Sequence, residues 1–165
     1  MKLKGFVVVV TLFALHTTAF SADVFSGTWK TIIEKSQFSP GPILKPSGPN
    51  FTRIESVQNG LRFVSDGVDG KGRKTHGEYT ATFDGRDSFY TQVVDGQADP
   101  DSAPSMVSLK TVDDRTLELT FKAAGRVVLV TKLVISPDGK GGTATSTGFN
   151  IDGSTSISTV FYERQ

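Results

Sequence analysis

The sequence predicts an all-β protein whose single domain closes into an antiparallel up-and-down barrel of about eight to ten strands. Three observations predict this fold. From residue 22 onward apolar and polar residues alternate with a period of two, most regularly over residues 116–122. Turn dipeptides containing Gly, Asn or Asp recur at intervals of roughly 8–12 residues. The same part of the chain has no sustained helical periodicity. A β-sandwich is the alternative fold.

Ten segments are rich in β-branched and aromatic residues, as expected for strands. They are residues 25–33, 51–57, 61–64, 75–83, 88–94, 106–112, 116–122, 126–135, 143–149 and 155–162. The turn dipeptides between them are Asn59-Gly60, Asp84-Gly85, Asp113-Asp114, Ala124-Gly125, Asp138-Gly139 and Asp152-Gly153. Gly, Asn and Asp tolerate the positive φ of tight hairpins. So many short strands favour closure, because a barrel leaves no exposed sheet edge.

Residues 1–21 have the pattern of a cleaved signal peptide. Lys2 and Lys4 precede an apolar run over residues 6–15, and Ala19-Phe20-Ser21 supplies the small residues of a cleavage site. The run is shorter than the roughly 20 residues that span a bilayer. We therefore expect cleavage before Ala22, a periplasmic or secreted protein, and one barrel domain over residues 22–165. An uncleaved anchor is the alternative.

Composition excludes several classes of function. The chain has no cysteine, which excludes a disulfide, a thiol nucleophile and a lipidated N-terminal cysteine. Its 18 Lys and Arg nearly balance its 17 Asp and Glu, and no basic segment is concentrated. A nucleic-acid partner is therefore not expected. Stable insertion into a membrane after cleavage is not expected either.

No metal or cofactor is predicted. Residues 22–165 hold one histidine and no cysteine, which excludes a His-rich metal site within one chain. The loop over residues 95–101 places oxygen-bearing side chains at every second position, Asp95, Gln97, Asp99 and Asp101, a spacing found in calcium loops. However, Met106 stands at the twelfth position, where such loops carry a glutamate.

Residues 36–50 form the one long irregular segment. Pro40, Pro42, Pro46 and Pro49 exclude a helix there. Phe38, Ile43 and Leu44 give the segment apolar anchors. We expect it to pack over one end of the barrel, either as a lid at a cavity mouth or as a plug.

Strand parity predicts which side chains face the interior. Taking Trp29 as inward, the apolar faces of the other strands supply enough large side chains to line a cavity or to fill one. The predicted cavity-lining residues are Trp29, Tyr79, Phe83, Phe89, Leu119, Phe121, Leu129 and Phe161.

Catalytic residues are not predicted. His76 and Glu78 share one strand face because they are two residues apart. A histidine beside a carboxylate is typical of general-base catalysis. That face also carries Thr80 and Thr82, which indicates that it points to solvent. An enzyme of the isomerase or cyclase type using His76, Glu78 and Tyr90 remains the alternative.

Two segments resemble the calycin superfamily, which contains the lipocalins and the fatty-acid-binding proteins. They are the opening Phe25-Ser26-Gly27-Thr28-Trp29-Lys30 and the closing Val160-Phe161-Tyr162-Glu163-Arg164-Gln165. The chain more closely resembles small exported bacterial proteins with lipocalin-like barrels, which lack an established activity. The residues behind that resemblance are Lys35-Ser36, Phe38 and Tyr79-Thr80-Ala81 followed by Phe83-Asp84-Gly85.

The chain departs from both groups. Fatty-acid-binding proteins have a helical pair after the first strand, where this chain has the proline segment. They bind the ligand carboxylate with Arg-x-Tyr in the last strand, and the matching Ser158-Thr159-Val160 offers no such charge. Secreted lipocalins commonly carry a disulfide.

The resemblance implies a non-enzymatic binder or carrier of a small, largely apolar molecule. Besides the enzyme, a second alternative is a packed barrel that acts through its loops, as an inhibitor or an envelope interaction module.

Overall fold

The computed structural model describes residues 22–40, 45–98 and 105–165. A short 3-10 helix, η1 (Ala22–Val24), precedes the strands. The strands are β1 (Gly27–Thr31), β2 (Phe51–Val57), β3 (Gly60–Val68), β4 (Lys74–Thr82), β5 (Ser88–Val94), β6 (Gln97–Ala98), β7 (Met106–Asp113), β8 (Thr116–Ala123), β9 (Arg126–Ile135), β10 (Gly141–Phe149) and β11 (Thr155–Arg164).

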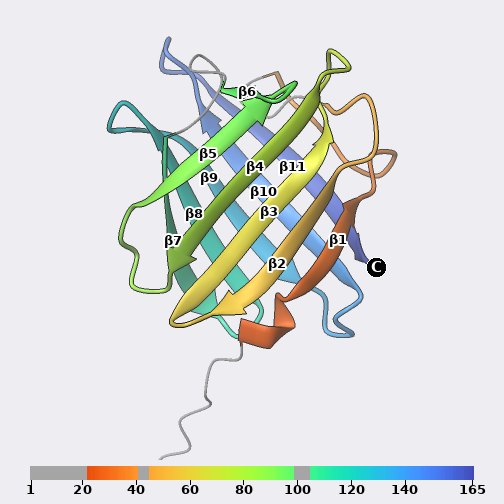
Figure 1. Cartoon of the computed structure of the whole chain (residues 1–165), viewed down its shortest axis with the longest axis vertical. Helices are drawn as coiled ribbons and strands as arrows, with labels where there is room; N and C mark the ends of the chain where they lie inside the picture. The colour runs from red at the N-terminus through yellow and green to blue at the C-terminus, as the bar shows by residue number, and fades with distance from the viewer. Residues whose placement is uncertain (1–21, 41–44, 99–104) are drawn as a thin grey trace, which may run out of the picture.

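These strands form one closed antiparallel barrel (Figure 1). Strands adjacent in the chain pair with each other, and the first strand closes on the last through Trp29 opposite Arg164. β6 lies outside the ring and extends only β5. Among the described residues the ring therefore has ten strands, which confirms the predicted up-and-down barrel and contradicts the β-sandwich.

The turns follow the predicted dipeptides. At the β8–β9 hairpin Ala124 and Gly125 both have positive φ, at 47° and 76°. Asn59, between β2 and β3, has φ of 58°. Two successive positive φ values match the right-handed twist of the flanking strands, which is why such residues form the tight hairpins of a meander.

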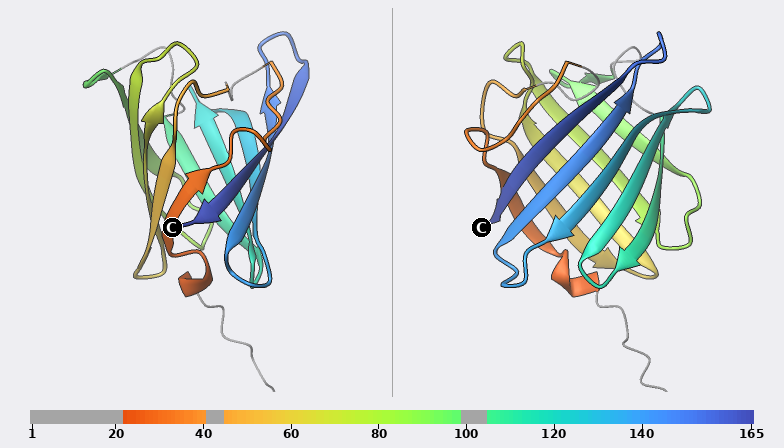
Figure 2. Two further views of the ribbon diagram at one scale, coloured as in Figure 1. Left: turned by 90° about the vertical axis from the view of Figure 1, so that its right-hand side faces the viewer. Right: turned by 180° about the vertical axis from the view of Figure 1, so that it is seen from behind.

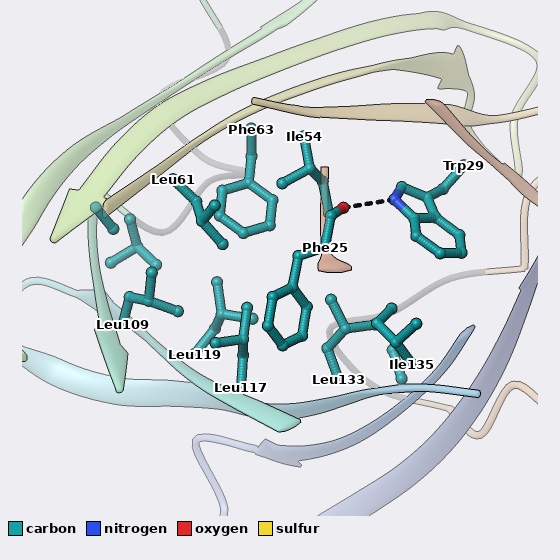
Figure 3. Packing of buried hydrophobic residues seen from close by; sticks show 13 residues of the cluster. Phe25, Trp29, Ile54, Leu61, Phe63, Leu109, Leu117, Leu119, Leu133 and Ile135 are labelled. Atoms are coloured by element: carbon teal, nitrogen blue, oxygen red, sulfur yellow. Dashed lines mark hydrogen bonds between the residues drawn. The ribbon is translucent and has the colours of Figure 1, made fainter. Parts of the chain in front are cut away.

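One end of the barrel is packed solid. The η1 helix and the β2–β3, β7–β8 and β9–β10 turns lie at this end, which we call the packed end (Figure 1). Phe25 follows η1, is fully buried and sits among side chains from the surrounding strands (Figure 3). The Trp29 indole Nε1 donates a hydrogen bond to the Phe25 carbonyl at 2.8 Å. The remaining fully buried large side chains are Leu61, Val107, Leu109, Leu117 and Ile135.

The first part of the proline segment belongs to the barrel wall. β1 ends at Thr31, and the chain then follows the free edge of β11 (Figure 2). Gln37 and Thr159 exchange two backbone hydrogen bonds of 2.8 Å, and the Ser39 amide donates to Ser158 Oγ at 3.0 Å. This part therefore covers a strand edge and not the barrel end that was predicted for the segment. Further on, Ser47 donates to the carbonyl of Asp69 in the β3–β4 turn, at the end opposite the packed end. Ile43 and Leu44, two of the predicted anchors, lie outside the described residues.

In the parts of the chain that the structure covers, no helix is both long and apolar enough for a membrane crossing.

Candidate ligand cavity

A cavity of about 200 Å³ lies inside the barrel, next to the packed end. Strands from both sides of the closure contribute to its wall, from β1 to β4 and from β8 to β11. Trp29, Ile54, Leu119 and Leu133 belong both to the buried core and to the cavity wall. The packed core therefore forms the floor of the cavity.

One part of the wall is aromatic. Ile54, Phe63, Tyr79 and Tyr90 lie opposite one another on four successive strands, so their side chains share the inner face. The rings of Phe63 and Tyr79 stack with centroids 4.6 Å apart. Phe121 meets Tyr79 edge-to-face at 5.8 Å. Edge-to-face and stacked contacts of this kind add stability beyond the apolar area they bury.

Hydroxyl groups form the other part of the wall. Thr52 and Ser65 are cross-strand partners on β2 and β3, and their hydroxyls are hydrogen-bonded at 3.0 Å. Thr131 and Ser146 are partners on β9 and β10, with hydroxyls 2.8 Å apart. Each pair uses one of its two O–H groups internally and keeps the other, together with free lone pairs. The pairs can therefore donate to an occupant or accept from it.

Two phenols also face the cavity, Tyr79 from β4 and Tyr162 from β11. Burial raises the pKa of Tyr79 well above its ordinary value, and raises the pKa of Tyr162 to about 12. Both phenols are therefore protonated at neutral pH and act as O–H donors.

The cavity wall carries no charge among the described residues. At the floor, the guanidinium carbon of Arg164 lies 4.6 Å from the centroid of the Trp29 ring. Its Nη2 donates to the Val24 carbonyl at 2.6 Å, which turns the guanidinium toward η1 at the packed end.

Five of the eight predicted cavity-lining residues lie on the wall: Trp29, Tyr79, Leu119, Phe121 and Leu129. Their contact with a ligand stays a prediction. Phe83 packs against the core and borders an outer hollow of about 570 Å³, so it does not line the cavity.

The predicted inward orientation of Phe89 and Phe161 is wrong. Phe89 is 81% exposed, and on β5 Tyr90 is the aromatic residue that contacts the core. On β11 Val160 and Tyr162 face the cavity, so Phe161 between them points outward. Both strands carry apolar residues on both faces, and a period of two then leaves the inward face undecided.

The polar part of the wall was not predicted from the sequence. The sequence did contain a sign that these residues face inward. Thr52 stands two residues before the apolar Ile54, and Thr131 stands two residues from both Leu129 and Leu133. Ser146 follows Ala144 by two residues in the same way. Residues two apart on a strand share a face.

His76 and Glu78 lie together, with His76 Nε2 4.0 Å from Glu78 Oε2, but Tyr90 does not join them. His76 Nδ1 lies 2.7 Å from Asp66 Oδ1, and Glu78 pairs with Arg62 at 2.8 Å, both in partly exposed contacts on the outer face. Tyr90 faces inward, where its hydroxyl donates to Gln92 Oε1 at 3.2 Å. The barrel wall separates the histidine and the carboxylate from the cavity.

No group of three or more His, Cys, Asp or Glu side chains suited to a metal occurs among the described residues. Asp99 and Asp101 of the loop with calcium-like spacing lie outside them. A second outer hollow, of about 580 Å³, lies between Lys30 and Glu163 on one side and residues 45–49 on the other. Charged side chains border both outer hollows, among them Lys30 and Glu163 in one and Asp84 and Arg86 in the other, whereas the described wall of the cavity has none. Small-molecule sites are mostly apolar with a few placed polar groups.

No protein-family model and no curated protein sequence matches the chain. Among solved structures it is similar to zebrafish ileal bile acid-binding protein complexed with cholic acid, with a TM-score of 0.53 and 14% sequence identity. The match covers 86% of this chain and 99% of that protein. At this identity the similarity concerns the fold alone. The chain therefore shares with that protein the fold of a closed antiparallel barrel.

Proposed function

We propose that the protein binds and carries a small, largely apolar molecule inside its barrel. The observation that carries this proposal is the cavity of about 200 Å³, with its aromatic and aliphatic floor and its few polar groups. Small-molecule sites typically combine these features. An apolar cavity of about 150 Å³ in another protein is large enough to bind benzene. The size of this cavity therefore suits a ligand of one or two rings.

The similarity to a bile acid-binding protein supports the proposal at the level of architecture, because that protein has a closed barrel of the same kind. Nothing in the described residues favours the enzyme alternative, since His76 and Glu78 lie outside the barrel. The cavity also counts against a barrel that is packed throughout and acts only through its loops.

Ligand binding can be tested with a neutral hydrocarbon, 2-ethylnaphthalene, by isothermal titration calorimetry. Trp29 is the single tryptophan of the chain and lines the cavity, so a change in its fluorescence would locate the bound probe. We expect saturable one-to-one binding.

A matched pair of variants on β10 locates the site further. Ala144 lines the cavity, whereas the adjacent Thr145 points outward. Ala144→Leu should fill the cavity and weaken binding about ten-fold or more, and Thr145→Leu should leave it unchanged. Equal affinity in Ala144→Leu would overturn the proposal, as would absence of binding both of this hydrocarbon and of the ketone of matched shape, 2-acetylnaphthalene.

We further propose that this binding takes place outside the cytoplasm. The support is the charged start, the apolar run over residues 6–15 and the Ala19-Phe20-Ser21 sequence. Intact-mass measurement of the protein recovered from a periplasmic fraction should give a chain that begins at Ala22. Recovery of the uncleaved chain from the cytoplasm alone would contradict export.

A further inference from the structure

The two phenols of the cavity come from different sides of the barrel. Tyr79 lies on β4 and Tyr162 on β11, with β1, β2 and β3 between them in the ring. The two side chains nevertheless line the same cavity of about 200 Å³. The phenols thus converge on the same space.

Neither phenol hydroxyl has a hydrogen-bond partner among the described residues, whereas the third tyrosine has one. The Tyr90 hydroxyl donates to Gln92 Oε1 at 3.2 Å. Gly77 leaves room for this hydroxyl, since a Cβ at that position would lie 2.8 Å from it. The Tyr79 and Tyr162 side chains border the cavity, so their unused O–H donors are available to an acceptor atom on the occupant.

The rest of the polar wall is also uncharged. It consists of the Thr52–Ser65 and Thr131–Ser146 hydroxyl pairs, and no described side chain on the wall bears a positive charge. Arg164 donates to the Val24 carbonyl at the packed end and stacks on Trp29, so it is engaged elsewhere. An anionic ligand would lose its hydration on entering the cavity and would find no cation among the described wall residues to compensate. Such a transfer of charge into an apolar site is strongly unfavourable.

Building on the proposed ligand-binding function, we propose that the natural ligand is an uncharged molecule with an apolar ring body and an acceptor oxygen, such as a ketone, ester or alcohol. The phenols of Tyr79 and Tyr162 donate hydrogen bonds to this oxygen. The rings of Phe63 and Phe121 both contact the Tyr79 ring and line the cavity. In this proposal they pack against the apolar body of the ligand.

Three probes of matched shape test this ligand class at pH 7. They are 2-acetylnaphthalene, which has a neutral acceptor, 2-ethylnaphthalene, which has none, and 2-naphthoate, which is anionic. A neutral hydrogen bond of ordinary strength corresponds to about five-fold in affinity. Calorimetry should therefore give tighter binding of the ketone than of the hydrocarbon, by about five-fold for each phenol that donates. The carboxylate should bind most weakly.

Phenylalanine variants assign the effect to the phenols. Tyr79→Phe and Tyr162→Phe should each reduce the advantage of the ketone over the hydrocarbon by about five-fold. The hydrocarbon should bind the variants at least as tightly as it binds the unmodified protein, because it leaves a phenol donor unpaired and the variants lack that donor; this binding also reports that the cavity is intact. Tyr90→Phe is the matched control, because its hydroxyl already has a partner, and should keep the full advantage of the ketone.

The possible failures are distinguishable. If none of the three probes binds, both the ligand-binding function and this inference fail. If ketone and hydrocarbon bind equally, or if the phenylalanine variants keep the preference for the ketone, the binding function stands and the inference is overturned. Binding of 2-naphthoate as tight as that of the ketone would likewise overturn it.

Discussion

Arg164, one residue from the end of the chain, lies over the ring of Trp29 in the first strand, with 4.6 Å between the guanidinium carbon and the ring centroid. The two residues face each other where β11 meets β1. The same guanidinium donates from Nη2 to the Val24 carbonyl at 2.6 Å. One side chain thus joins the helix η1, the first strand and the last strand at the packed end.

Replacement of Arg164 should loosen this closure. Arg164→Met removes the cation–π contact and the charged hydrogen bond, and should lower the free energy of unfolding by about 2–3 kcal/mol. Arg164→Lys keeps the charge but not the planar group that stacks on the indole, and should give an intermediate loss. Urea denaturation followed by Trp29 fluorescence measures both. Arg164 Nε is buried without a hydrogen-bond partner, and the cost of its burial offsets part of the stability that the other contacts of Arg164 contribute. Stability of Arg164→Met equal to that of the unmodified protein would show that the offset is complete.

The sequence was sufficient to predict the barrel because its strand pattern and turn residues agree. Each of the ten predicted strand segments coincides with a strand of the ring, and the Ala124-Gly125 hairpin has the positive φ values expected of it. Closure, however, depends on pairing between the two ends of the chain, which no local pattern encodes. Two observations pointed to it: the number of short strands, which favours closure because a barrel leaves no exposed edge, and the resemblance of the opening and closing segments to the calycins.

The cavity could be predicted only in part. Inward positions were correct on β8, where Leu119 and Phe121 alternate with polar residues. They were wrong for Phe89 and Phe161, because apolar residues occupy both faces of those strands. The hydroxyl pairs were missed because the inward face was assumed to be apolar throughout, whereas Thr52 and Ser65 satisfy each other across the strands. Such mutual satisfaction depends on register, which the sequence does not show.

The contrast between two phenylalanines tests the corrected inward assignment. Phe25 is fully buried at the packed end, so Phe25→Ala should lower the free energy of unfolding by about 3–5 kcal/mol. Phe89 is 81% exposed, so Phe89→Ala should change it by no more than about 0.5 kcal/mol. Urea denaturation of both variants measures the difference. A large loss in Phe89→Ala would indicate that its side chain is covered in solution.

All three tyrosines of the chain should titrate abnormally. The pKa values of Tyr79, Tyr90 and Tyr162 are all raised, with burial as the largest cause. Phenolate absorbance of the folded protein should therefore stay low near pH 10, where tyrosines in the unfolded chain are half ionised. A titration in concentrated urea supplies that reference. Ordinary titration of even one tyrosine in the folded protein would contradict its burial.

The raised pKa of Tyr162 makes the stability of the folded protein depend on pH in the alkaline range. Tyr162 has a pKa of about 12 in the folded protein and about 10 when unfolded. Between these values the unfolded chain loses the proton first, so stability is intact below pH 10 and falls as pH rises toward 12. The total loss from this residue is about 3 kcal/mol, at about 1.4 kcal/mol for each unit of pKa. Urea denaturation at pH 9 and pH 11 should show a smaller loss for Tyr162→Phe than for the unmodified protein. An equal loss would mean that Tyr162 does not contribute.

Gly60, at the start of β3, tests how closely the strands approach at the packed end. A Cβ at this position would lie 2.2 Å from the carbonyl oxygen of Ala81 and 3.0 Å from Thr82 Cα, both backbone atoms of β4. Because backbone cannot rotate aside as a side chain can, Gly60→Ala must separate the two strands. We expect it to lower the free energy of unfolding by about 3 kcal/mol, at the upper end of the range for an overpacked core.

Gly125→Asn is the matched control. Its φ of 76° is one that asparagine tolerates, and a Cβ there would meet nothing within 4 Å. The control should stay within about 0.5 kcal/mol of the unmodified protein in urea denaturation. Similar losses in the two variants would mean that backbone conformation, rather than contact between β3 and β4, determines the requirement for glycine.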